Sequence, residues 1–128
     1  GKMQIKGEIV PPRGQPGWSS SVLLLDAVGK AQDLSEYQGV RLLLKVQQGN
    51  LSVSANSLEI TNFDYHAAPV FVKNDGQFHE VKIPFSNMKR AWSEQTELNK
   101  KAINSLSLVA FGLQKSSFDF EVDEVGFY

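Results

Sequence analysis

The chain ends in FDFEVDEVGFY, residues 118–128, which places four carboxylates within six positions among aromatic residues. Carboxylates at this density can perform acid–base catalysis, bind a divalent cation, or line the solvent face of a strand. Acid–base chemistry needs two carboxyl groups in different environments, whereas Asp119, Glu121 and Asp123 share one face of an extended strand. The spacing therefore favours a strand with one face in water. A calcium site that uses Asp119 and Asp123 is the second interpretation.

The apolar residues of this stretch change parity near its end. They occupy even positions from Phe118 to Val122 and odd positions from Val125 onward. A shift of one residue moves side chains to the other face of a sheet. We therefore predict a bulge or bend at Asp123–Glu124.

The rest of the sequence gives no positive support for catalysis. The two histidines, His66 and His79, have no partner at metal-ligand spacing, and there is no cysteine. A G-x-S-x-G nucleophile motif is missing, as is a glycine-rich phosphate loop before a helix. We expect a protein that is not an enzyme and has no cofactor, apart from the calcium interpretation.

The composition is that of a soluble globular protein with one core. The 128 residues are 41% hydrophobic and 21% charged, and thirteen basic against fourteen acidic residues give a net charge of −1. This balance argues against nucleic acid or an anionic membrane as a partner. The apolar runs are shorter than the roughly 20 residues of a membrane helix. Nothing in the composition fixes the compartment.

Short apolar stretches alternate with turn residues along the whole chain. The strands expected from this pattern cover residues 3–10, 20–27, 39–48, 50–60, 68–85, 105–114 and 118–128. Among them we expect a bulge at Gly7, a strand covered on both faces at 20–27, and a hairpin around Asn74–Gly76. Residues 86–106 are predicted to form a long connection. The pattern predicts a single antiparallel β-sandwich of jelly-roll type over residues 1–128.

Four short motifs follow one another in an informative order. They are Asp33-Leu34-Ser35 with Tyr37 and Gly39, then FHEVKIPF at 78–85, INSLSLVAFG at 103–112, and the closing FDFEVDEVGFY. In this order they resemble the complex I intermediate-associated protein 30 family, and the early MQIKGEIVPPRGQPGW resembles that family's glycine-rich second strand. The resemblance implies a galactose-binding-like sandwich. It also implies a non-catalytic accessory or assembly domain that binds another protein or a neighbouring domain of its own chain.

One departure from the family concerns the start of the sequence. The family begins with a segment of the type W-x-x-x-x-D-x-x-M-G-G-x-S, which is missing here, and GKMQIKGEIV reads as a strand already under way. We therefore expect either a fragment of a longer chain or a sheet that is partly supplied elsewhere. An incomplete sheet edge would favour a protein partner.

The most distinctive loop sequence is NFDYHAAP at 62–69. Sugar recognition uses an aromatic surface beside polar groups, and Asp64, Tyr65 and His66 offer both. The alternative is an ordinary loop in which Phe63 packs inward and its neighbours are wet, since aromatic residues more often join cores.

Two tryptophans extend the set of candidate ligand-binding residues. Trp92 lies in the polar stretch KRAWSEQT, where an exposed ring would suit sugar stacking or a protein contact. Alternatively, Trp92 pins the connection onto the core. Trp18 follows a Pro/Gly-rich loop and is expected at the end of the sandwich or at the loop tip. With Arg90 as a nearby polar group, these residues define a carbohydrate-binding module as the alternative function.

Overall fold

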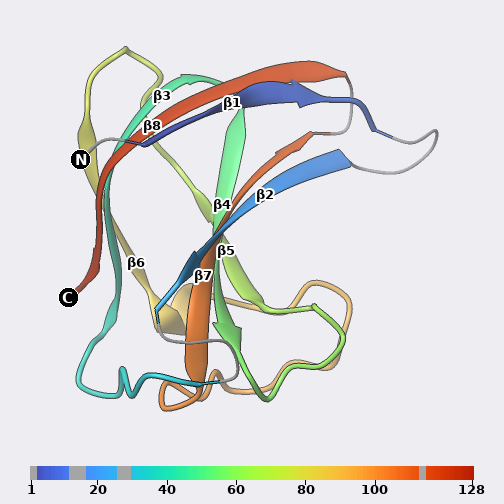
Figure 1. The fold of residues 1–128 in the computed structure, drawn as a ribbon, viewed down its shortest axis with the longest axis vertical. Coiled ribbons are helices and arrows are strands. Elements are labelled where there is room, and N and C mark those ends of the chain that lie inside the picture. Colours follow the sequence, from blue (N-terminus) through green and yellow to red (C-terminus); the bar gives the residue numbers. More distant parts are fainter. Residues whose placement is uncertain (1–2, 12–16, 26–29, 113–114) are drawn as a thin grey trace.

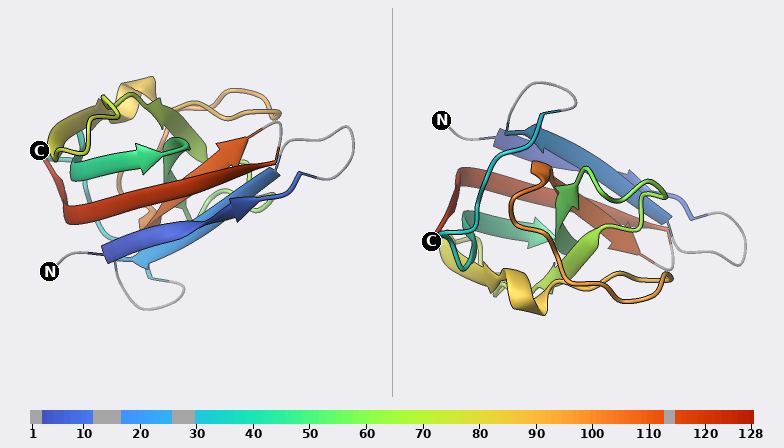
Figure 2. Two further views of the ribbon diagram at one scale, coloured as in Figure 1. Left: turned by 90° about the horizontal axis from the view of Figure 1, so that it is seen from above. Right: turned by 90° about the horizontal axis from the view of Figure 1, so that it is seen from below.

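Two four-stranded antiparallel sheets pack face to face and form a β-sandwich (Figures 1 and 2). The computed structural model describes residues 3–11, 17–25, 30–112 and 115–128. The strands are β1 (Met3–Ile9), β2 (Gly17–Leu24), β3 (Gly39–Gln48), β4 (Asn50–Ser57), β5 (His66–Val70), β6 (His79–Pro84), β7 (Ile103–Gly112) and β8 (Ser116–Phe127). The first sheet has the order β1-β8-β3-β6, and the second has the order β2-β7-β4-β5. The predicted all-β jelly-roll sandwich is confirmed.

The core lies between the two sheets and follows from side-chain alternation. In β3, Val40, Leu42 and Leu44 are fully buried at every second position, as the sequence predicts. Phe118 and Phe120 of β8 enter the same core with ring centroids 6.0 Å apart. The central strands of both sheets therefore supply most of the buried apolar surface.

The bulge predicted near the end of the chain is present. Leu44 of β3 pairs with Val122, whereas the preceding residue of β3, Leu43, pairs with Glu124. Asp123 is thus the extra residue on β8, and its presence changes the parity of the following side chains. The prediction at Asp123–Glu124 is confirmed.

The carboxylates of β8 lie on the outer face of the first sheet. Glu121 pairs with Lys45 at 2.7 Å, and Glu124 pairs with Arg41 at 2.6 Å. Arg41 also contacts Glu80 of β6 at 3.0 Å. These carboxylates join neighbouring strands through partly exposed ion pairs, which matches the interpretation of a strand with one wet face.

The bulge predicted at Gly7 is wrong. β1 and β8 pair without a shift from Met3–Val122 to Ile9–Ser116, and Gly7 lies opposite Phe118. A Cβ atom at Gly7 would lie 3.0 Å from the Phe118 ring. The glycine therefore makes room for this ring and leaves the strand regular.

The strand predicted to be covered on both faces is an edge strand. β2 ends at Leu24, pairs with β7, and pairs with no other described strand. The Val22 side chain is 57% exposed. The apolar run misled the prediction because part of it lies on the outer face of the sheet.

The predicted hairpin is also wrong. β5 pairs with β4 in the second sheet, whereas β6 pairs with β3 in the first sheet, so residues 71–78 cross from one sheet to the other. The turn itself is real, because Asp75 Oδ1 accepts a hydrogen bond from the backbone N–H of Gln77 and Gly76 has φ +74°. Such a turn fixes the local chain direction but not the strand partner.

The long connection predicted at 86–106 is confirmed in outline. It contains a single 3-10 turn, η1 (Phe85–Asn87), and ends where β7 begins at Ile103. Its first part lies along the free edge of β5, where Ala67 and Lys89 exchange two backbone hydrogen bonds. Among the described residues, no helix has the length and apolar character needed to cross a membrane.

Phe120→Ala should destabilise the fold strongly, because Phe120 is fully buried. We expect a loss of about 3–5 kcal/mol in the free energy of unfolding, measured with urea. Phe71→Ala is the matched control, since Phe71 is 86% exposed and should change stability by no more than about 0.5 kcal/mol. Equal effects of the two variants would contradict this description of the core.

Candidate functional site

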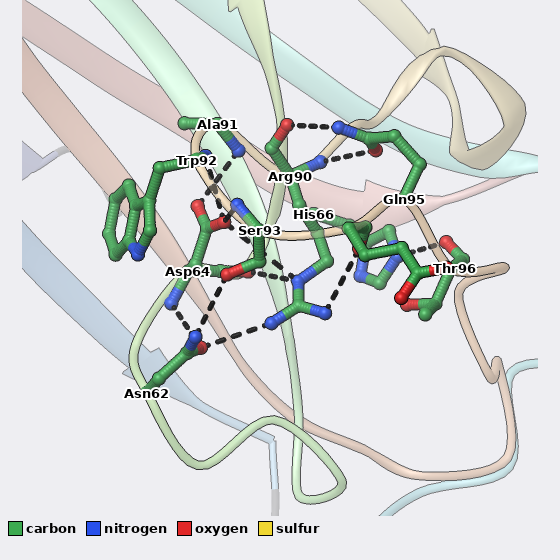
Figure 3. A network of polar contacts seen from close by, with 10 residues as sticks. Asn62, Asp64, His66, Arg90, Ala91, Trp92, Ser93, Gln95 and Thr96 are labelled. Atoms are coloured by element: carbon green, nitrogen blue, oxygen red, sulfur yellow. Dashed lines mark hydrogen bonds and ion pairs between the residues drawn. The ribbon is translucent and has the colours of Figure 1, made fainter.

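The buried carboxylate of Asp64 fixes the long connection to the loop before β5 (Figure 3). Asp64 is only 2% exposed. Its Oδ1 accepts a hydrogen bond from the N–H of Ala91 at 2.8 Å, and its Oδ2 accepts from Trp92 at 2.9 Å and Ser93 at 2.6 Å. Three consecutive backbone donors thus converge on one carboxylate.

Arg90 reinforces this junction from the other side. Its Nε donates to the Asp64 carbonyl at 2.9 Å, and its two terminal nitrogens donate to Asn62 Oδ1 at 3.1 Å and the Glu94 carbonyl at 3.2 Å. Asn62 in turn donates to the hydroxyl of Ser93 at 2.8 Å. The two loops are therefore joined by a closed network of polar contacts, drawn in Figure 3.

The charge on Asp64 is maintained in the folded protein. Burial raises the pKa of this carboxyl, but the hydrogen bonds from Ala91, Trp92 and Ser93 together outweigh burial. The net result is a pKa below the usual range for aspartate. A buried anion with this many donors is a positioning group.

The junction presents three aromatic side chains, Phe63, Tyr65 and Trp92, which we call the aromatic rim. Phe63 is 77% exposed and Trp92 is 69% exposed. The Phe63 and Tyr65 rings meet edge to face, with centroids 6.3 Å apart at 82°. In Figure 3 the Trp92 indole points away from the polar network. The alternatives in which Phe63 packs inward or Trp92 pins the connection to the core are wrong.

The backbone at Phe63 is itself unusual. Its φ is +63°, a left-handed conformation that side-chain-bearing residues rarely adopt. Such a conformation costs on the order of 1–3 kcal/mol and persists only where neighbouring contacts enforce it. The adjacent Asp64 junction supplies those contacts.

The outer face of the second sheet carries a second feature, a polar row of Ser54, Asn56, Ser105 and Ser107. All four are buried although they alternate with core residues and face away from the core. Ser54 donates to Asn56 Oδ1 at 2.7 Å, while Asn56 Nδ2 donates to Ser105 at 3.0 Å and Ser107 at 2.8 Å. Because these two serines accept from Asn56, their hydroxyl hydrogens are not used in these bonds.

The polar row runs between aromatic residues. Ala55 pairs with His66, so strand alternation places Tyr65 of the aromatic rim on the same face as Asn56. Phe111 lies four residues beyond Ser107 on the same face of β7, about 13 Å away along the strand. Sequence reasoning missed this row. The signal was present as serine or asparagine at every second position in SVSAN and SLS.

His66 faces the opposite side of the sheet and is also buried. Its Nε2 lies 2.6 Å from the Thr96 carbonyl, which can only accept, so Nε2 carries the hydrogen. Nδ1 of this ring has no hydrogen-bond partner in the described part of the chain. The Thr96 contact therefore ties the later part of the connection to β5.

Two hollows lie on either side of this tied segment. One of 680 Å³ is lined by Phe85, Met88, Lys89 and Leu98, among others. The other, of 230 Å³, is lined partly by His66 and Arg90. Thr96 and Glu97 line both hollows, so the connection separates them.

The structure brings most of the predicted ligand-binding residues together. Those gathered at the junction are Asp64, His66, Arg90 and Trp92 (Figure 3), together with Tyr65, whose ring meets that of Phe63. Trp18 belongs to β2 and lies opposite Phe111, and its side chain is outside the described part of the structure. The ligand-binding roles of all six residues remain predictions.

The two aspartates of the calcium interpretation lie on the other sheet. Asp119 accepts a hydrogen bond from Gln4 at 3.1 Å, and Asp123 is the bulged residue of β8. Within residues 3–11, 17–25, 30–112 and 115–128, no three histidine, cysteine, aspartate or glutamate side chains gather as a metal site. Calcium binding at Asp119 and Asp123 stays a prediction.

Comparison with known proteins assigns the family. Residues 2–122 match the family described as Complex I intermediate-associated protein 30 (CIA30), and the chain belongs to this family. The resemblance drawn from the sequence motifs is thereby confirmed. None of the curated proteins matches the chain.

Solved structures show the same fold at low sequence identity. The chain is similar to the family 11 carbohydrate-binding module of the cellulosomal cellulase Lic26A-Cel5E of Clostridium thermocellum. The TM-score is 0.62 at 16% identity, covering 99% of this chain and 82% of that one. A family 11 carbohydrate-binding module from Clostridium thermocellum in complex with a β-1,3-1,4-mixed-linked tetrasaccharide gives a TM-score of 0.62 at 15% identity, covering 99% of this chain and 83% of that one. These similarities establish the architecture.

Asp64→Asn should destabilise the protein, because an amide replaces a carboxylate that accepts three backbone N–H groups. We expect a loss of about 1–3 kcal/mol at neutral pH, measured by urea unfolding. Since the folded pKa lies below the unfolded value of about 3.9, the wild type should lose this contribution as the pH falls below about 4.

The Asp64→Asn variant should lack this part of the acid dependence. Asp123→Asn is the control, because Asp123 lies at a partly exposed bulge, and it should leave both stability and its pH profile nearly unchanged. An acid profile identical in all three proteins would contradict the role of Asp64.

Proposed function

We propose that this chain is a non-catalytic accessory domain that binds another protein, or a neighbouring domain of its own chain, through the aromatic rim. The observation that carries the proposal is the exposure of Phe63 and Trp92, at 77% and 69%, on two loops locked together by Asp64. Large apolar rings held in water are characteristic of interaction sites.

The rigidity of the rim supports a binding role. A surface that is ordered before binding loses less conformational entropy when the partner arrives. The Asp64 and Arg90 contacts fix the backbone on both sides of the rim. The same contacts engage the carboxylate of Asp64 and the guanidinium of Arg90 in holding the two loops together. This use of the charged groups fits a domain without catalysis.

The ring geometry favours a protein partner over a sugar at this position. The Phe63 and Tyr65 rings stand nearly perpendicular, at 82°, and so offer no shared flat platform to a sugar ring. Phe63 also lacks a polar group that could bond a hydroxyl. The family description, as an intermediate-associated protein, agrees with a role in association.

Removing the rim should weaken partner binding strongly while preserving the fold. The double variant Phe63→Ala/Trp92→Ala should lose a partner that the wild type captures from a lysate of the source organism, identified by mass spectrometry. We expect a loss of about 2 kcal/mol or more, or roughly thirtyfold in affinity once the partner is purified. Phe71→Ala is the matched control, since Phe71 is an equally exposed aromatic residue beyond the far end of β5.

Three outcomes decide the proposal. Loss in the rim variant and retention in Phe71→Ala would support it. Retention of the partner in the rim variant, or equal loss in both variants, would overturn it. Unchanged urea unfolding of the rim variant shows that the loss does not come from misfolding.

A glycan is the second candidate ligand, favoured by the polar row. The hydroxyl hydrogens of Ser105 and Ser107 are not used in the bonds from Asn56, although the two residues are only 6% and 7% exposed, and aromatic residues stand beyond both ends of the row. Hydrogen-bond donors flanked by aromatic rings are the elements that sugar recognition uses. One protein with this fold is known in complex with a mixed-linkage tetrasaccharide, which makes that sugar the first probe.

The glycan candidate predicts binding that depends on the polar row and not on the rim. On a glycan array that includes the mixed-linkage tetrasaccharide, the wild type and Phe63→Ala/Trp92→Ala should bind alike. Ser105→Ala/Ser107→Ala should bind roughly thirtyfold more weakly, because two hydrogen bonds of roughly 1 kcal/mol each are removed. A blank array for the wild type would exclude this candidate for the glycans tested.

A further inference from the structure

Each sheet of the sandwich ends in two edge strands, whose outer backbone groups are open to another strand. The first sheet ends in β1 and β6, and the second ends in β2 and β5. In an antiparallel pair, half of the N–H and C=O groups of an edge strand point away from its neighbour. Natural proteins protect such edges with charges, proline or a covering segment.

Both edges of the first sheet carry this protection. β1 contains Lys6 and Glu8, and β6 contains Glu80 and Lys82 and ends in a proline. Charged side chains on an edge disfavour the approach of a second strand. We expect neither edge to pair with another chain.

One edge of the second sheet is also blocked. β5 contains Pro69, which has no backbone N–H to donate. The neighbouring Ala67 already exchanges backbone hydrogen bonds of 3.0 and 2.9 Å with Lys89 of the connection. The long connection therefore closes this edge.

β2 is the exception. Its eight residues, GWSSSVLL, include neither a charge nor a proline, and among the described residues it pairs with β7 alone. Ser19 and Ser20 are exposed and Val22 is 57% exposed, so the middle of the strand is open to solvent, whereas Gly17 at its start is packed against Ile9 and Pro11. This strand has the length and sequence that edge-to-edge pairing requires. In Figure 2 it lies at one side of the sandwich, next to β1.

We propose that β2 is a homodimerisation edge, at which a second copy of this chain adds its own β2 in antiparallel orientation. A twofold axis near Ser21 would place Ser20 of each copy opposite Val22 of the other. Residues of equal parity then face the same side of the joined sheet, as continuous pairing requires. The dimer would contain one eight-stranded sheet made from the two second sheets.

A second copy of β2 is a chemically compatible partner for this edge. Antiparallel self-pairing of an uncharged strand opposes no like charges, so no cross-strand repulsion arises. The net charge of the chain is −1, which gives little repulsion between copies. A twofold interface is also the commonest arrangement for homo-oligomers, since each copy supplies what the other needs.

The dimer would have a functional consequence without depending on the function proposed above. The polar row lies on the outer face of the second sheet, so the joined sheet would present two such rows on one side. Two aromatic rims would accompany them. A partner or polymer with repeated sites would then bind by avidity.

The test is sedimentation velocity of the whole chain over a range of concentrations, with hydrogen exchange of the β2 amides. We expect a monomer–dimer equilibrium and slower exchange of β2 at higher concentration. Ser20→Lys/Val22→Lys places lysines opposite one another only in the dimer, and it should raise the dissociation constant roughly tenfold or more. Thr61→Lys/Asn74→Lys adds the same charge on exposed loops and should dimerise as the wild type does.

The outcomes separate this proposal from the function of the rim. A wild type that remains monomeric at every concentration would overturn the dimer, as would undiminished association of the Ser20→Lys/Val22→Lys variant. Dimerisation of Phe63→Ala/Trp92→Ala at wild-type strength would support the assignment to β2, whereas its loss would place the contact at the rim. Unchanged urea unfolding of the lysine variants checks their fold.

Discussion

The organisation of the candidate site depends on one buried anion. Asp64 is taken out of water, and an unpaired carboxylate there would be strongly unfavourable. The N–H groups of Ala91, Trp92 and Ser93 compensate for this loss of hydration. These donors belong to a connection with almost no regular secondary structure. The hydrogen bonds to the carboxylate therefore hold this connection in place, as the backbone hydrogen bonds of a helix or strand do elsewhere. The hydrogen bonds to Asp64 also determine the exposed positions of Phe63 and Trp92.

The features that the sequence predicts well are those determined by local alternation. The inward positions of β3 follow from the even spacing of Val40, Leu42 and Leu44. The bulge at Asp123 follows from a parity change that can be read within eleven residues. In both cases the two-residue side-chain period of an extended chain determines which residues face the core. The order of the family motifs adds the architecture, which no single motif specifies.

The features that the sequence does not predict depend on contacts between distant segments. The turn at Asp75–Gly76 is correctly recognised, yet β5 and β6 join different sheets because their partners, β4 and β3, are decided by the whole fold. Asp64 has the same polarity as a ligand-binding residue, and only the approach of residues 91–93 shows it to be a positioning group. The alternating serines and asparagine of SVSAN and SLS are visible in each strand, but they form one polar row only because β4 pairs with β7.

The placement of β7 and β8 has a consequence for biosynthesis. These strands come from the last quarter of the chain, and β7 joins β2 to β4 while β8 joins β1 to β3. A ribosome releases β7 and β8 after the strands that they join, so β1 and β2 must wait without a partner on either side, while β3 and β4 wait with one open side. Most contacts between residues are distant in sequence, which predicts slow folding after synthesis. A chaperone that shields β-strands would be most useful before residue 103 has emerged.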